Sequence, residues 1–134
     1  MSTRREARER AVSICYELEI RAGLTVDALL EDLPAPPDEY ALRLVRGVEE
    51  RREELDALIR KYSEHWALER MPLVDRAILR IGTYELGWEP ALSTGVIISE
   101  AVEVAKQYST KDSGRFVNGL LARIAEDLRA PDRT

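Results

Sequence analysis

Apolar residues recur at intervals of three and four along most of the chain, which is the spacing of amphipathic helices. The first run covers about residues 3–21. Its apolar stripe comprises Ala7, Ala11, Ile14, Cys15 and Leu18. A shorter run follows Thr25 over about residues 26–33, and the prolines within residues 34–37 then exclude helix because each restricts the residue before it. This stretch predicts two helices and a connector.

The middle of the chain predicts one long helix from Asp38 to about Tyr62. Its apolar residues keep a period of about 3.6 residues, except within the charged cluster at residues 49–54. Gly47 is unfavourable inside a helix, and it therefore indicates either a close crossing with another helix or a kink.

Three further helical patterns fill the second half of the chain. Pro72 suits the first position of a helix that ends near Gly87. The next apolar run ends at Tyr108, and Asp112 or Ser113 is expected to cap the last helix. β-branched residues rarely alternate with polar ones, so no sheet is expected.

The fold class that these patterns predict is all-α. We expect a compact bundle of about six to seven helices in one domain of 134 residues. The helices are expected to form two packed halves, at about residues 1–65 and 66–134. No apolar run approaches the roughly 20 residues that span a membrane, and the charged N-terminus lacks the apolar core of a signal peptide. A cytoplasmic protein is therefore expected.

The sequence offers little support for catalysis. His65 is the lone histidine and has no sequence partner that would make it a general base. The acidic residues are scattered among arginines and lysines, as on solvated helix faces. No metal-binding or nucleotide-binding motif is present, and Cys15, the only cysteine, is expected to be a small buried apolar residue. We expect no enzyme, no cofactor and no metal.

Positive charge gathers at the start of the chain, although the net charge is −5. Residues 1–10 contain four arginines against two glutamates. Guanidinium groups suit phosphates because they are planar, permanently charged and bidentate, so this tip is a candidate RNA-binding segment. The alternative is a tip that only increases solubility. Lys111 and Arg115 add positive charge near the last interhelical turn, and the two patches would form one track if that turn folds beside the first helix.

Four short segments are more specific than apolar spacing. They are DRAILR at 75–80, YEL at 84–86, EAVE at 100–103 and FVNG at 116–119. These segments resemble the C-terminal half of the NusB family of bacterial transcription antitermination factors. Ser99 departs from that family, which usually has Asn or Asp at this position, but as a small polar residue it is expected to serve the same helix start.

The resemblance implies a NusB-like bundle whose arginine-rich first segment binds boxA-type leader RNA. The RNA-binding residues expected from the resemblance and from charge are Arg4, Arg5, Arg8, Arg10, Lys111 and Arg115. The resemblance also implies a surface that binds NusE, the small-subunit ribosomal protein that serves in antitermination. The partner-binding positions implied are Tyr16, Glu69, Asp75, Asp112 and Phe116. The implied function is to help assemble a termination-resistant RNA polymerase complex, chiefly at ribosomal RNA operons.

Two other functions fit parts of the sequence. One is a protein-only helical scaffold or homodimer, in which the apolar edge of the last helix pairs with itself. Within that edge, Asn118 is expected to be a buried polar residue and Gly119 to allow close helix approach. The other is a stand-alone RNA-targeting module, like the NusB-like domain of some ribosomal RNA methyltransferases. A full enzyme of that kind needs a Gly-rich cofactor domain, which is not expected here.

Overall fold

The computed structural model describes residues 3–64 and 66–129, which contain seven α-helices, one 3-10 turn and no strand. The elements in chain order are α1 (Arg4–Ile20), α2 (Val26–Asp32), α3 (Glu39–Glu50), α4 (Arg52–Tyr62), η1 (Leu68–Arg70), α5 (Leu73–Trp88), α6 (Thr94–Tyr108) and α7 (Lys111–Leu128). The predicted all-α bundle is confirmed.

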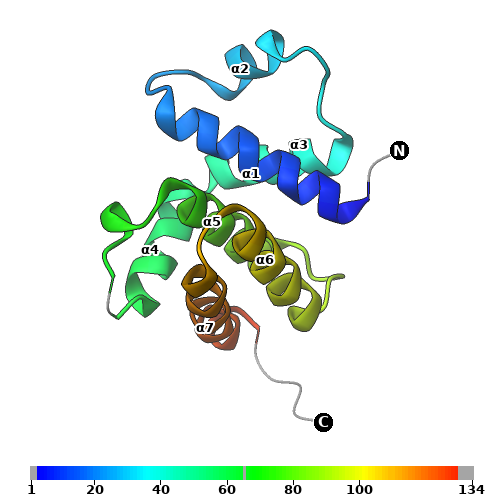
Figure 1. Ribbon diagram of the computed structural model, residues 1–134. Helices are drawn as coiled ribbons and strands as arrows, with labels where there is room; N and C mark the ends of the chain where they lie inside the picture. The colour runs from blue at the N-terminus through cyan, green and yellow to red at the C-terminus, as the bar shows by residue number, and fades with distance from the viewer. Residues whose placement is uncertain (1–2, 65, 130–134) are drawn as a thin grey trace.

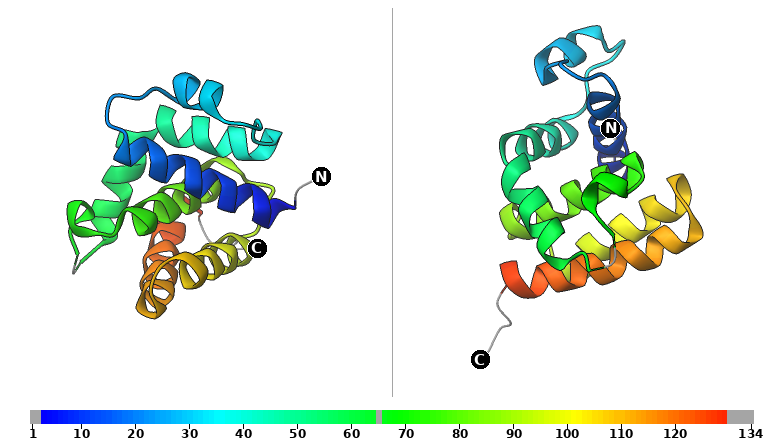
Figure 2. Two further views of the ribbon diagram at one scale, coloured as in Figure 1. Left: turned by 45° about the horizontal axis from the view of Figure 1, so that its top comes forward. Right: turned by 90° about the vertical axis from the view of Figure 1, so that its left-hand side faces the viewer.

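Helix α5 lies at the centre of the bundle and packs against α1, α3, α4, α6 and α7. Its residues from Ala77 to Leu86 are buried without interruption, so this helix is surrounded rather than amphipathic. Helices α1, α2 and α3 lie on one side of α5, and the paired helices α6 and α7 lie on the other (Figures 1 and 2). Contacts made by α5 therefore decide how both sides are placed.

Most helices begin where a short polar side chain can satisfy a free backbone N–H. Thr3 and Glu6 form a capping box at α1. The side chains of Thr25, Asp38, Ser93 and Thr110 cap α2, α3, α6 and α7.

Two expectations about caps were wrong. Thr110 caps α7, so neither Asp112 nor Ser113 does. Ser99 lies exposed inside α6, whose cap is Ser93, so its difference from the family motif affects no helix start.

The single long helix predicted for the middle of the chain was also wrong. Arg51, with φ −112° and ψ 17°, separates α3 from α4 inside the charged cluster. The change of direction lets α3 pack on α1 and α5, while α4 packs on α5 and α7. One straight helix could not reach both sets of neighbours.

Gly47 marks a close crossing between α3 and α5, and not the helix break. A Cβ atom at this position would overlap the ring of Tyr84 and lie 2.9 Å from its Cδ1 atom. The close crossing considered from the sequence is thus confirmed. Gly119 has no such role, because an added Cβ would meet no atom within 4 Å. Asn118 is exposed, so its expected burial was wrong as well.

These two glycines allow a matched test of packing. We expect Gly47→Ala to destabilise the protein by about 1–3 kcal/mol, because the added methyl group overpacks the crossing with Tyr84. Gly119→Ala should stabilise it by about 0.5–1 kcal/mol, because alanine is the better helix former and meets open space. Urea denaturation measures both. Equal stabilisation by the two changes would contradict the close crossing.

Candidate nucleic-acid interface and partner face

The arginines at the start of α1 point to different neighbours. Arg4 is exposed, with its guanidinium carbon 4.1 Å from the ring centroid of Tyr40. Arg5 is also exposed, and its Nη2 lies 2.6 Å from Oε2 of Glu100 on α6. The hydrogen bond from Arg5 lowers the pKa of Glu100 and keeps that carboxylate charged. Both arginines keep surface that a phosphate can reach.

Arg8, in contrast, belongs to the interior. Its side chain is 4% exposed, and its Nε donates to both carboxylate oxygens of Glu85, at 3.0 and 2.9 Å. The hydroxyl of Tyr40 donates to the same carboxylate at 2.5 Å. The three residues join α1, α3 and α5. This arrangement corrects the expectation of one exposed arginine cluster, since Arg8 binds a buried carboxylate and not solvent.

The remaining cations lie further along the surface. Arg10 is half-buried, and its Nη2 donates to the carbonyl oxygen of Ala35 at 2.7 Å. Lys111 and Arg115 are exposed at the start of α7. The hydroxyl of Tyr108 donates to Glu9 at 2.9 Å, which places the end of α6 beside α1. The sequence predicts that these cations and the arginines at the start of α1 form one RNA-binding surface. This stays a prediction.

The residues expected to bind a protein partner surround the start of α5. Asp75 is fully buried, and its Oδ2 accepts a 2.8 Å hydrogen bond from Ser113 Oγ, which ties α5 to α7. Its Oδ1 has no hydrogen-bond partner among the described residues. The structure thus gives Asp75 an internal role, and the expectation that its carboxylate is displayed on the partner face was wrong.

Three of the expected partner residues are accessible nearby. Glu69 is exposed and accepts hydrogen bonds from Arg60, which lower the pKa of Glu69. Asp112 is exposed in the first turn of α7. Phe116 is half-buried against Trp66, edge to face, with ring centroids 5.3 Å apart. Sequence reasoning missed Trp66 as a site residue, although an aromatic residue just before the segments that carry the family resemblance was a signal.

Tyr16 opens onto a groove of about 290 Å³ between α1, α5 and α6. The lining residues are Glu9, Val12, Ser13, Tyr16, Val74 and Tyr108. Nothing in the sequence connects Val74 or Tyr108 with Tyr16, because only tertiary packing brings these helices together. We call Tyr16, Trp66, Glu69, Asp112 and Phe116, together with this groove, the partner face.

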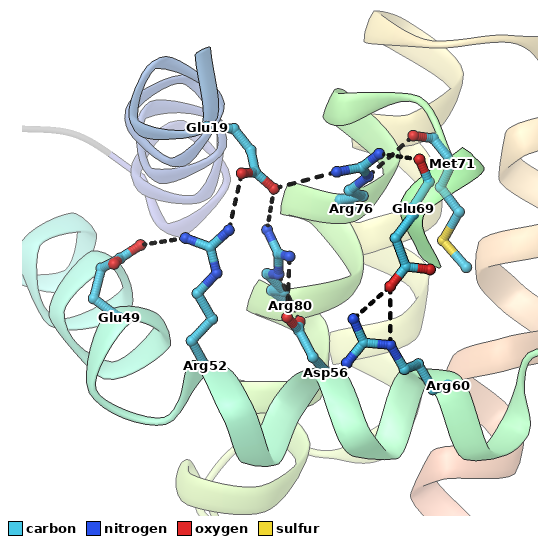
Figure 3. Close-up of polar contacts among 9 residues, drawn as sticks. All are labelled: Glu19, Glu49, Arg52, Asp56, Arg60, Glu69, Met71, Arg76 and Arg80. Atoms are coloured by element: carbon cyan, nitrogen blue, oxygen red, sulfur yellow. Dashed lines mark hydrogen bonds and ion pairs between the residues drawn. The ribbon is translucent and has the colours of Figure 1, made fainter. Parts of the chain in front are cut away.

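A network of ion pairs holds α1 in place relative to the partner face. Figure 3 shows Glu19 of α1 between Arg52 of α4 and two arginines of α5, Arg76 and Arg80. The closest contacts of Glu19 are 2.7 Å to Arg80 Nη1 and 2.9 Å to Arg52 Nη2. Burial alone would raise the pKa of Glu19, but the hydrogen bonds and charges of Arg80 and Arg52 lower it overall. Glu19 is therefore held as a charged junction.

The same network reaches η1. Arg76 donates to the carbonyl oxygens of Met71, at 3.1 Å, and Glu69, at 2.5 Å (Figure 3). Arg80 also binds Asp56 of α4 through two hydrogen bonds of 2.7 and 3.2 Å. The backbone that presents Glu69 is thus fixed to α5, which in turn is fixed to α1.

No group of three or more His, Cys, Asp or Glu is placed to bind a metal within residues 3–64 and 66–129. No helix in the same ranges is long and apolar enough to cross a membrane. Cys15 is buried as expected, and burial raises the pKa of its thiol to about 12. His65 lies outside the described residues.

Comparison with known proteins shows which class this architecture belongs to. The family model described as the NusB family matches residues 5–126. A transcription antitermination protein NusB from Kineococcus radiotolerans is 45% identical over 129 residues, covering 94% of this chain and 95% of that protein.

Solved structures of NusB proteins are similar to this chain as well. T. maritima NusB superposes with a TM-score of 0.86 at 39% identity, covering 97% of this chain and 94% of that chain. A crystal structure of the antitermination factors NusB and NusE in complex with dsRNA matches with a TM-score of 0.78 at 29% identity, covering 92% of this chain and 96% of that chain.

The helical bundle and these similarities define a transcription antitermination factor, which is a binding protein and not an enzyme. The chain belongs to the NusB family. The resemblance found in its sequence is confirmed.

Arg8 and Arg5 differ in burial, and their replacement should separate stability from surface charge. We expect Arg8→Ala to cost about 3–5 kcal/mol, because it leaves the buried carboxylate of Glu85 without its cation. Arg5→Ala removes the same charge from the same helix but only an exposed ion pair, so its unfolding midpoint should stay close to that of the unaltered protein. Urea denaturation measures both, and equal losses would refute the structural role of Arg8.

Proposed function

We propose that this chain is an antitermination factor that binds boxA-type RNA together with NusE. The observation that carries the proposal is that one helix serves both candidate surfaces. Arg4 and Arg5 lie at the start of α1, and Tyr16 lies on the same helix about 18 Å further along. Support also comes from the related solved complex, which contains NusB, NusE and dsRNA.

The accessible arginines fit the RNA part of this function. Arg4 and Arg5 are exposed, and Arg10 keeps part of its surface, so their guanidinium groups can bind phosphates. Lys111 and Arg115 extend the positive charge at the other end of the α1–α6 contact. Arg8 contributes indirectly, because its ion pair with Glu85 fixes α1 on the bundle. Phosphate contacts of this kind position the protein on RNA without selecting bases.

The partner face fits a basic protein. Glu69 and Asp112 supply exposed carboxylates, and Trp66, Phe116 and Tyr16 supply aromatic surface for a buried centre. Charge complementarity would speed the capture of a ribosomal protein such as NusE. Asp75 supports this face from within, by fixing the start of α7 beside that of α5.

Bridging is the proposed mechanism. When this chain and NusE are joined, the pair binds RNA more tightly than either protein alone. Once one of them has bound the RNA, the other meets it at a high effective concentration. The joined pair would then enter the RNA polymerase complex that resists termination, chiefly at ribosomal RNA operons in the cytoplasm. We propose that residues 1–134 act as one domain with two halves, since α5 packs on helices of both. Self-association into a homodimer would compete with NusE if it used the same face.

The RNA proposal is tested by titrating labelled boxA RNA with this protein, with and without NusE, at two salt concentrations. We expect the double change Arg4→Ala with Arg5→Ala to weaken binding and to lower the log–log salt slope by about 1.4, because two phosphate contacts on a single strand are lost. The melting temperature should change little, since both side chains are exposed.

The matched control is Arg21→Ala with Arg46→Ala, which removes two exposed arginines away from the tip. Its salt slope should stay close to that of the unaltered protein. If the salt slope changed equally in the two double variants, RNA binding would depend only on the net charge of the protein. Sedimentation of the same samples reports any homodimer.

Asp112→Lys tests the partner face. We expect it to weaken NusE capture strongly while lowering the melting temperature only slightly, because Asp112 is exposed and Thr110, not Asp112, caps α7. Glu126→Lys is the control, as an exposed charge reversal at the opposite end of α7. Isothermal titration with NusE measures the affinities. If both reversals weakened NusE binding equally, the start of α7 would not be part of the interface.

A further inference from the structure

Arginine side chains rest on aromatic rings along α3, beyond the arginine-rich tip. The guanidinium carbons of Arg4 and Arg43 lie 4.1 and 5.3 Å from the ring centroid of Tyr40. The guanidinium carbon of Arg51 lies 4.6 Å from the ring of Trp88. All three distances are within the range of cation–π attraction.

These residues form one continuous row. Tyr40, Arg43 and Gly47 follow each other at intervals of three and four residues, so they share one face of α3, and Arg51 at the C-cap of α3 comes four residues later. The ring of Tyr84 packs against Gly47, and it stacks on Trp88 with centroids 5.9 Å apart and planes 12° from parallel. The row is about 16 Å long from the helical rise per residue. It begins where Arg4 of the tip lies over Tyr40. We call Arg4, Tyr40, Arg43, Trp88 and Arg51 the α3 row.

The cations of the α3 row are only weakly engaged. Within the described residues, Arg4 has no carboxylate partner. Arg43 and Arg51 are 56% and 38% exposed, and each makes a single ion pair, with the largely buried Glu89 at 3.2 Å and with the exposed Glu54 at 3.5 Å. The exposed pair with Glu54 contributes little to stability, and a phosphate could replace that carboxylate. Arg43 keeps more than half of its side-chain surface open, so a phosphate can contact it beside Glu89. Arg8 and Arg80 differ, because buried carboxylates hold them through several bonds.

We propose that single-stranded RNA bound at the tip continues along the α3 row. The aromatic rings orient the guanidinium groups before RNA arrives, so less side-chain freedom is lost on binding a phosphate. The guanidinium planes that lie over these rings can also stack on unpaired bases, which a single strand can offer and a duplex cannot. An acidic protein segment would bind the arginine charges of the α3 row, but it has no bases to stack on the guanidinium planes. This inference rests on the proposed RNA function.

Arg43 and Arg46 provide the matched test. Both lie on α3 and are similarly exposed, at 56% and 49%, but Arg46 pairs with Asp27 of α2 and has no aromatic contact among the described residues. With a short labelled single-stranded boxA RNA, we expect Arg43→Ala to weaken binding about fivefold and to lower the log–log salt slope by about 0.7. Arg46→Ala should leave both values close to those of the unaltered protein. Thermal melting confirms that each variant is folded.

Trp88 supplies an independent readout. The chain has two tryptophans, so Trp66→Phe leaves Trp88 as the sole tryptophan. We expect single-stranded RNA to quench or shift its fluorescence, with the same midpoint as RNA anisotropy. If RNA binds but Trp88 does not respond and Arg43→Ala equals Arg46→Ala, the α3 row is excluded while the proposed function stands. If the unaltered protein binds no RNA, the proposed function fails and the row fails with it.

Discussion

A carboxylate buried on the central helix is the constraint on which the rest of the structure depends. Glu85 is 1% exposed, and a charge so placed is tolerated only with a cation and hydrogen bonds around it. Arg8 supplies the cation from α1, and Tyr40 supplies a hydroxyl from α3. Removing α1 from α5 would leave the charge without its cation, and removing α3 would take away the hydroxyl that donates to it. Two helices distant in sequence are therefore fixed on α5 by one side chain.

A second anchor acts at the other end of α1. Glu19 binds Arg52 and Arg80, and the network continues through Arg76 to the backbone of η1. Since α1 is held near both ends, the surfaces that it carries keep a fixed spacing. Exposed arginines at its start and the groove beside Tyr16 can then act together, which is what a bridging protein requires. The interior ion pairs thus serve function by fixing positions and need not contact RNA or a partner.

The arginines show why site prediction from sequence was only partly successful. Arg4, Arg5 and Arg8 are equivalent in a linear reading, yet the first two are exposed and the third is buried. The difference depends on Glu85, which is 77 residues away from Arg8 in the chain. Asp75 was expected on the partner face, but it is buried. Its hydrogen-bond partner, Ser113, lies on another helix and is also distant in the sequence. Long-range polar contacts leave no local periodicity to detect.

By itself, the sequence determined the helical class, most helix starts and the family. Those properties depend on apolar spacing, on capping residues such as Thr25 and Asp38, and on short motifs, all of which are local. Only the tertiary structure decided that the chain turns at Arg51 and which charges are buried. Those outcomes depend on packing against α5, where the free energy of a side chain is set by neighbours from distant segments.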